Sequence, residues 1–321
     1  MLAGVLRFPA IPGLDEIRFL TNSSMMDIAF LPEHLIIVGG GYVGLEFGQI
    51  YRRFGSEVTI VEMGPRLIGR EDEDVSECVR EILENEGVRI RLDAKCISLA
   101  KRDGRVAVGI QCDEGPSEVL GTHVPLAVGR TPNTQDLGLD RAGVAIDQRG
   151  HIIVDDQLQT TVPGVWALGD CNGRGAFTHT SYNDYEIVAA NLLDGDHRRV
   201  SDRIQTYALY TDPPLGRCGM TDAEIRKSGR AALATKYPMI RVSRAFEKAE
   251  TQGFMKICVD AETKQILGAA ILGTGGDEVV QILLDVMYAK APYTVIQRAM
   301  HIHPTVAEYL PTILLKLQPF V

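Results

Sequence analysis

The sequence predicts an α/β fold in which a domain with a parallel sheet is followed by an α+β domain. Two observations support this prediction. Strands alternate with helices from about residue 35 onward, which is typical of a parallel sheet. Beyond about residue 202 the pattern changes to longer strands with helices between them, which favours an α+β domain. A chain of 321 residues is long enough for two domains with their own cores.

Composition and charge narrow the class of protein. The net charge of −9 argues against nucleic acid or an anionic membrane as the main partner. No run approaches the roughly 20 apolar residues that a membrane span needs. The six cysteines are scattered without paired spacing, which indicates reduced thiols and neither a zinc site nor a redox-active pair. We therefore expect a cytoplasmic protein that binds no metal.

The first strands and helix have the order of a Rossmann unit. An apolar strand at 35–38 is followed by the run Gly39-Gly40-Gly41-Tyr42-Val43-Gly44, and then by apolar residues at helical spacing up to Gly55. A second strand, 57–61, ends at Glu62. Strand, glycine turn, helix, strand and acid in this order predict a dinucleotide site.

Each part of this motif has a chemical reason. Glycines permit a tight turn and let the backbone approach a pyrophosphate at the helix N-terminus. Glu62 can accept hydrogen bonds from ribose hydroxyls and should repel a 2′-phosphate, which favours NAD over NADP. Arg66 and Arg70 leave that preference open. The alternatives are a purely structural glycine turn and a solvated charge at the end of a strand.

The pattern of alternating elements continues after Glu62. We expect a helix at 72–86 with acids in its first turn, a strand at 88–92, and a hairpin at 96–112 that turns at Asp103-Gly104. An apolar run at 124–128 then ends at Gly129.

The middle of the chain adds a second candidate ligand loop. Residues 162–170 read as a turn, a buried strand and the strand-end acid Asp170. Ligands bind in loops at the carboxyl ends of parallel strands, so Asp170 could hold a hydroxyl chain. Asp170 could equally be a turn or helix N-cap residue.

The C-terminal elements are predicted from local signals. Thr221 and Glu224 have capping-box spacing before a short helix that Gly229 ends. Two strands, 254–259 and 266–272, flank a polar turn and precede an amphipathic helix at 277–289. The apolar faces of such a domain suit a dimer interface.

A possible acid/base pair lies near the C-terminus. His303 precedes Pro304, and a residue before proline is disfavoured in helical conformation, so we expect an extended segment and then a helix that starts at Pro304-Thr305. Glu308 would lie one turn inside that helix and could hold the imidazole in one tautomer for general acid/base catalysis. Alternatively, Thr305 and Glu308 form a capping box with only a structural role.

Together these motifs resemble the pyridine nucleotide-disulfide oxidoreductases, the flavoprotein family of dihydrolipoamide dehydrogenase, glutathione reductase and mercuric reductase. The resemblance covers about residues 12–317, with four motifs in the family's order. Residues 12–51 and the C-terminal part look most like bacterial mercuric-reductase-like and reactive-chlorine-resistance flavoproteins. The resemblance implies hydride transfer from nicotinamide to flavin, then electron transfer to a disulfide or another small-molecule acceptor.

The resemblance also implies roles for individual residues. Those that match the NAD(P) site are Gly39, Gly41, Tyr42, Val43, Gly44, Glu62 and Gly129. Those that match the second FAD motif or pass the flavin ring edge are Gly169, Asp170, Phe177, Thr178 and His179. The family's catalytic pair, which reaches across a homodimer, matches His303 and Glu308. NAD(H), with NADP less favoured, and FAD are the implied cofactors.

One departure from the family pattern changes the expectation for activity. The family's N-terminal domain, with its own glycine motif and active disulfide, has no counterpart here. We therefore expect an incomplete FAD site and impaired or absent turnover in a truncated chain. The expected parts are a linker remnant of the FAD domain at 1–24, a Rossmann-type NAD(P)-binding domain at 25–130, a central FAD-contacting segment at 131–202 and a dimerisation domain at 203–321. The cysteine pair that ends mercuric reductase is also missing.

Two other functions remain open at this point. The chain could be a non-catalytic NAD(H)-binding dimerisation module, kept for sensing or assembly. A metal-binding protein is the weaker alternative, because it rests only on His301, His303 and scattered thiols.

Overall fold

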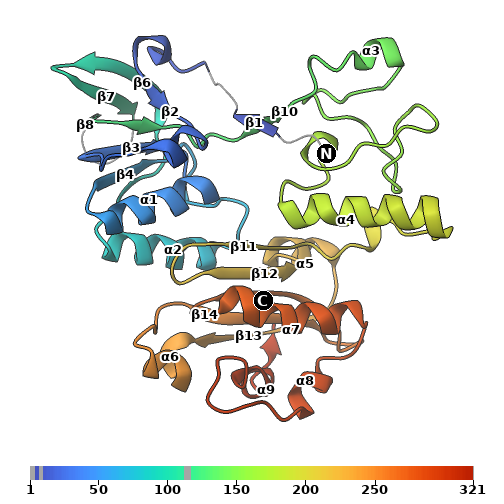
Figure 1. The fold of residues 1–321 in the computed structure, drawn as a ribbon. Coiled ribbons are helices and arrows are strands. Elements are labelled where there is room, and N and C mark those ends of the chain that lie inside the picture. The colour runs from blue at the N-terminus through green and yellow to red at the C-terminus, as the bar shows by residue number, and fades with distance from the viewer. Residues whose placement is uncertain (1–3, 7–9, 112–116, 321) are drawn as a thin grey trace. The chain divides into compact units, whose positions relative to one another are not determined.

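The computed structural model describes residues 4–6, 10–111 and 117–320, and the chain divides into two compact units (Figure 1). One unit contains Met1–Pro9 and Val128–Arg203, and the other contains Ala10–Ala127 and Ile204–Val321. Part of the expected remnant at 1–24 therefore lies outside the described residues. The expected domain boundaries at residues 24, 130 and 202 stay predictions.

The larger unit holds the parallel sheet that the sequence predicts. Its elements, in chain order, are β2 (Phe19–Leu20), β3 (His34–Val38), α1 (Tyr42–Phe54), β4 (Glu57–Val61), α2 (Glu73–Asn85), β5 (Arg89–Arg91) and β9 (Val124–Pro125). β3 pairs with β4, β4 with β5, and β2 with β9, always parallel. Bridges from His123 to Leu35 and from Leu126 to Val38 join β9 to the other side of β3. The expected Rossmann unit is thus present.

A small antiparallel sheet interrupts this domain. It consists of β6 (Lys95–Arg102), β7 (Arg105–Gln111) and β8 (Glu118–Gly121). Asp103 and Gly104 have φ values of 50° and 78°, and positive φ at both central residues is what a type I′ hairpin turn requires. The predicted turn is confirmed, while Cys112 at the predicted end of the hairpin lies outside the described residues.

A six-stranded antiparallel sheet forms the C-terminal part. Its strands, in spatial order, are β11 (Thr206–Leu209), β12 (Leu215–Gly219), β15 (Ile266–Leu272), β14 (Phe254–Asp260), β13 (Ala232–Pro238) and β16 (Gln318–Pro319). The helices around it are α5 (Asp222–Ser228), α6 (Ser243–Glu247), α7 (Gly276–Tyr288), α8 (Thr294–Arg298) and α9 (Tyr309–Leu314). α7 packs on β12 and β15. The capping box that begins α5 is present as predicted.

One apolar core joins the parallel sheet to this C-terminal sheet. Leu35 and Ile60 of the parallel sheet belong to the same buried cluster as Leu215 and Leu272 of the antiparallel sheet. Because the cluster also includes side chains of α1 and α2, the nucleotide-motif helix is packed within a core shared by both sheets. Within the described residues, none of the helices is both long and apolar enough to cross a membrane.

The smaller unit has little regular structure. β1 (Gly4–Leu6) pairs with β10 (Arg130–Pro132), and its helices are α3 (Leu139–Ala142) and α4 (Thr178–Ala189). Short helical turns occur at η3 (Asp170–Asn172), η4 (Ala190–Asp194) and η5 (Val200–Asp202). A compact core around Leu158 and Ile187 holds these segments together.

Two predicted elements differ from the structure. Residues 162–170 contain no strand, only an isolated bridge from Trp166 to Gln159, because the chain bends into η3 at Asp170 soon after the turn at Gly164. The last helix begins at Tyr309 and not at Pro304-Thr305. The capping-type hydrogen bonds of Thr305 and Glu308 close a turn there, without a helix following directly from Thr305.

Candidate functional site

The glycine turn after β3 is shaped by backbone crowding. Gly39 has φ of 114°, a conformation that side chains disfavour. A Cβ added to Gly44 would lie 2.2 Å from the Gly39 carbonyl oxygen, so the first turn of α1 packs directly on the loop. A Cβ added to Gly41 would meet no atom within 4 Å. The turn therefore leaves open space at the N-terminus of a 13-residue helix, where amide groups and the helix dipole favour a phosphate.

Glu62 lies against this turn. Its Oε2 accepts a hydrogen bond from the Gly40 amide at 2.6 Å, and its Oε1 accepts one from the Gly64 amide at 2.7 Å. The carboxylate therefore shapes the turn, a role that the sequence reasoning did not include. Each carboxylate oxygen can accept a further hydrogen bond, so these contacts are compatible with ribose binding.

Tyr42 and Val43, the other predicted nucleotide residues, begin α1. The Tyr42 hydroxyl donates a hydrogen bond to Glu71 Oε1 at 2.6 Å, and its ring lies 5.8 Å from that of Tyr207. Val43 is partly exposed. The Tyr42 hydroxyl is thus already engaged with a residue that the sequence reasoning missed.

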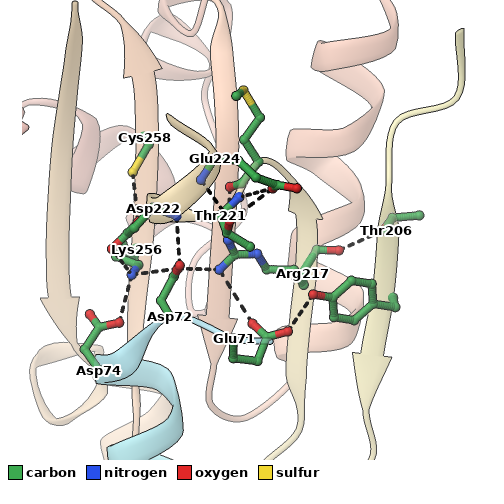
Figure 2. Close-up of polar contacts among 12 residues, drawn as sticks. Glu71, Asp72, Asp74, Thr206, Arg217, Thr221, Asp222, Glu224, Lys256 and Cys258 are labelled. Atoms are coloured by element: carbon green, nitrogen blue, oxygen red, sulfur yellow. Dashed lines mark hydrogen bonds and ion pairs between the residues drawn. The ribbon is translucent and has the colours of Figure 1, made fainter. Parts of the chain in front are cut away.

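Glu71 belongs to a buried group of charges between the segment before α2 and the C-terminal sheet (Figure 2). Arg217 Nη1 lies 2.6 Å from Asp72 Oδ2 and 3.7 Å from Glu71 Oε2. Lys256 Nζ lies 2.9 Å from Asp72, 2.8 Å from Asp74 and 2.8 Å from Asp222. These three carboxylates converge as a metal site would require, but the Lys256 ammonium occupies the position between them.

The surroundings shift the pKa values of Asp72 and Lys256. Burial acts to raise the pKa of Asp72, but Arg217 and Lys256 outweigh it and hold that pKa below its ordinary value. Burial acts to lower the pKa of Lys256, yet its hydrogen bonds to Asp222, Asp72 and Asp74 raise it to about 12. The Asp72 carboxylate and the Lys256 ammonium are therefore both charged at neutral pH, and each lies against opposite charges.

The candidate flavin loop lies in the smaller unit. Gly169 has φ 83° and ψ −159°, a combination that is essentially restricted to glycine. The buried Asp184 holds the loop, because its Oδ2 accepts hydrogen bonds from the Gly169 amide at 2.9 Å and the Asn172 side chain at 2.8 Å. Asp170, the predicted flavin ligand, follows as the first residue of η3, and Arg130 Nη1 lies 3.9 Å from its carboxylate. The hydrogen bonds to Asp184 therefore fix the conformation of this loop.

The remaining predicted flavin residues are in the same unit. Thr178 begins α4, and the Phe177 and His179 rings stack with centroids 5.3 Å apart. Gly129 has φ of 104°. Gly129 was predicted to close over the nucleotide, but it belongs to the smaller unit while the glycine turn belongs to the larger one. Its role stays a prediction.

His303 and Glu308 are paired. His303 Nδ1 lies 3.0 Å from both carboxylate oxygens of Glu308, and the imidazole is 73% exposed. The same carboxylate accepts a hydrogen bond from the Thr305 amide at 3.4 Å, and the Thr305 hydroxyl accepts one from the Glu308 amide at 3.2 Å. The Glu308 carboxylate therefore contacts both the His303 imidazole and the Thr305 amide, so a capping role and an acid/base role are compatible. The open imidazole edge can exchange a proton with a bound molecule.

A charged cavity lies at the opposite end of the parallel strands. His34 and Glu57, at the amino ends of β3 and β4, line it together with Arg89 and Arg105. Arg89 lies 3.1 Å from Glu57, and Arg105 lies 3.2 Å from Glu33. Since ligands of such sheets bind at the carboxyl ends of the strands, the glycine turn is the better candidate site.

Comparison with known families identifies the chain. A model of the family described as pyridine nucleotide-disulphide oxidoreductase matches residues 4–184, and the model of its dimerisation domain matches residues 206–313. The chain belongs to the pyridine nucleotide-disulphide oxidoreductase family. Members are FAD-dependent oxidoreductases that use NAD(P)H, so the predicted fold class, family and cofactor classes are confirmed.

Individual relatives support the same assignment. The chain is 35% identical to the probable pyridine nucleotide-disulfide oxidoreductase RclA of Escherichia coli (strain K12) over 304 residues, which covers 94% of this chain and 68% of RclA. It is 32% identical to a mercuric reductase of Streptomyces lividans, covering 94% of this chain and 64% of that protein. A solved structure of RclA, a Cu(II) complex of an HOCl-induced flavoprotein disulfide reductase, superposes with a TM-score of 0.91 at 33% identity, covering 97% of this chain and 72% of that one.

Proposed function

We propose that this chain binds NAD(H) at the glycine turn and supplies the nucleotide-binding and dimerisation parts of an FAD-dependent oxidoreductase. The observation that carries the proposal is the open space over Gly41 at the start of α1, next to the carboxylate of Glu62. A pyrophosphate fits there because no side chain fills the space, and the helix N-terminus favours negative charge. The carboxylate favours NAD over NADP because it repels a 2′-phosphate.

We further propose roles for the other site residues. Asp170 and Thr178 bind FAD, which accepts hydride from the nicotinamide when bound. His303 exchanges protons with a disulfide or another small-molecule acceptor, and Glu308 fixes the orientation of its ring. The family's dimerisation domain is present, which supports a homodimer through residues 203–321. The scattered cysteines support a cytoplasmic location.

A second candidate is a non-catalytic NAD(H)-binding dimerisation module. The observation that favours it is the single compact unit formed by the Rossmann elements and the C-terminal sheet, with a shared core and a buried charge network. Such a unit could bind nucleotide and a second copy without turnover.

Visible absorption of the purified chain, before and after addition of FAD and then NADH, distinguishes the two functions. A flavin spectrum that NADH bleaches supports the oxidoreductase. Calorimetric NADH binding without flavin uptake supports the binding module. A chain that binds neither NADH nor FAD contradicts both proposals.

A further inference from the structure

The Glu71 carboxylate connects the first residue of α1 to the C-terminal sheet. Its Oε1 accepts hydrogen bonds from two hydroxyls, that of Tyr42 at 2.6 Å and that of Tyr207 on β11 at 2.5 Å. The side chain is 0% exposed, and among the described residues its Oε2 has no hydrogen-bond partner, although Arg217 Nη1 lies 3.7 Å away. A buried carboxylate oxygen without a donor is costly, so this arrangement is poorly explained by stability alone.

The segment that carries Glu71 also contacts the glycine turn. The Ile68 amide donates a hydrogen bond to the Gly40 carbonyl oxygen at 2.9 Å, and the Leu67 side chain packs so closely that a Cβ at Gly40 would lie 2.7 Å from it. Ile68 has φ of 40°, an unfavourable conformation for a β-branched residue. Strain of this kind persists only where surrounding contacts enforce it. The segment is therefore held tightly against the turn.

On its other side, the segment is anchored to the C-terminal sheet. Asp72, next to Glu71, contacts Arg217 of β12 at 2.6 Å and Lys256 of β14 at 2.9 Å, and it accepts a hydrogen bond from the Asp222 amide at 2.8 Å (Figure 2). Residues 67–72 therefore contact both the glycine turn and the C-terminal sheet.

We propose that Glu71 is a positioning residue for the nucleotide site, through which Tyr207 of the dimerisation domain sets the affinity for NADH. This inference rests on the proposed binding of NAD(H) at the glycine turn. Loss of the Tyr207 hydroxyl removes one of the two hydrogen-bond donors to Glu71 Oε1. The Glu71 carboxylate then moves toward Arg217. Tyr42 is hydrogen-bonded to the same oxygen and starts α1, so the helix N-terminus shifts with it.

The test compares the full chain with the variants Tyr207→Phe and Tyr210→Phe. Tyr210 follows β11 directly, and its side chain is 68% exposed, so Y210F is a matched control. NADH binding is measured by calorimetry and thermal unfolding by circular dichroism. We expect Y207F to raise the Kd for NADH about fivefold or more, in the range of ordinary coupling between sites, while Y210F leaves it unchanged. The double variant Y42F/Y207F should lose no more affinity than the worse single variant, because both hydroxyls act through one carboxylate.

Several outcomes overturn the inference. If Y207F lowers the unfolding temperature but binds NADH as the parent does, Glu71 only stabilises the fold. If the losses in Y42F and Y207F multiply, the two hydroxyls act separately. Should Y207F not fold, Glu71→Gln replaces it, since a neutral amide oxygen accepts more weakly than a carboxylate; an unchanged Kd would again refute the idea. A parent chain that binds no NADH overturns the proposed function, and the inference with it.

Discussion

Gly41, in the glycine turn, and Gly44, in the first turn of α1, should respond differently to substitution by alanine. Gly41→Ala adds a methyl group to open space, whereas Gly44→Ala places one 2.2 Å from the Gly39 carbonyl oxygen. If the turn cradles a pyrophosphate, the first variant should lose NADH and keep its stability. The second should lose stability irrespective of any ligand.

The expected magnitudes follow from the backbone. Gly41 is the N-cap of α1 with φ of −84°, which alanine adopts freely. Alanine is a poor N-cap, which lowers the free energy of unfolding by about 1 kcal/mol. Alanine also reduces the conformational freedom of the unfolded chain, which raises the free energy of unfolding by about 0.4–1 kcal/mol. The net change in the free energy of unfolding is therefore close to zero. At Gly44, alanine gains about 0.5–1 kcal/mol of helix propensity, while overpacking against backbone costs about 1–3 kcal/mol or more.

Calorimetric titration with NADH and urea unfolding measure the two effects separately. A methyl group in the pyrophosphate cradle should weaken binding about ten- to a hundredfold, which corresponds to an overpacking cost of about 1.4–2.8 kcal/mol. Gly48→Ala is the matched control, because the atoms nearest to its Cβ would be side-chain carbons of Ile60, at 3.1 Å, and Ile37, at 3.4 Å, and not backbone atoms. If Gly41→Ala binds NADH as tightly as Gly48→Ala, the pyrophosphate does not lie over Gly41 and the reasoning fails.

Three further predictions concern charge and protons. Hydrogen bonds to three aspartates raise the pKa of Lys256 from 10.5 to about 12, so the charged lysine stabilises the folded state by about 2 kcal/mol. This stabilisation is fully present below pH 10.5 and is lost as the pH rises through 12. Urea unfolding from pH 9 to 12 should show this extra alkaline loss in the parent but not in Lys256→Met; equal slopes would contradict it. In a preparation that turns over, His303→Ala should slow the half-reaction that needs a proton donor while leaving flavin reduction by NADH nearly unchanged, and stopped-flow traces in which both steps slow together would exclude the acid/base role. Glu62→Gln, which keeps an acceptor for the Gly40 amide but removes the charge, should raise the Michaelis constant for NADH relative to that for NADPH; an unchanged ratio would mean that Glu62 only shapes the turn.

Much of the fold could be predicted because its signals are local. The strand, glycine turn and helix of the Rossmann unit lie within about thirty consecutive residues, and hydrophobic periodicity and glycine chemistry determine each element. The same reasoning placed α7 and β15 in the C-terminal part correctly. It failed at residues 162–170, where an apolar run resembles a strand but the chain turns before a ladder forms.

The sequence by itself also predicted the candidate site residues that lie close together along the chain. His303 and Glu308 are five positions apart, and Gly39, Gly41 and Gly44 lie close together at the glycine turn and the start of α1. Such residues meet because the local backbone conformation brings them together, so their types and spacing are sufficient for a prediction.

Only the tertiary structure decided which buried charges meet. Tyr207 lies 136 positions from Glu71, and Arg217 lies 145 positions from Asp72, yet these pairs are hydrogen-bonded. No local pattern distinguishes Arg217 on a strand from an exposed arginine, because its partners Glu71 and Asp72 come from the distant segment before α2, which packs on the C-terminal sheet. Buried charges are tolerated only when such packing supplies their partners, so the link between the nucleotide turn and the C-terminal sheet exists only in the folded chain.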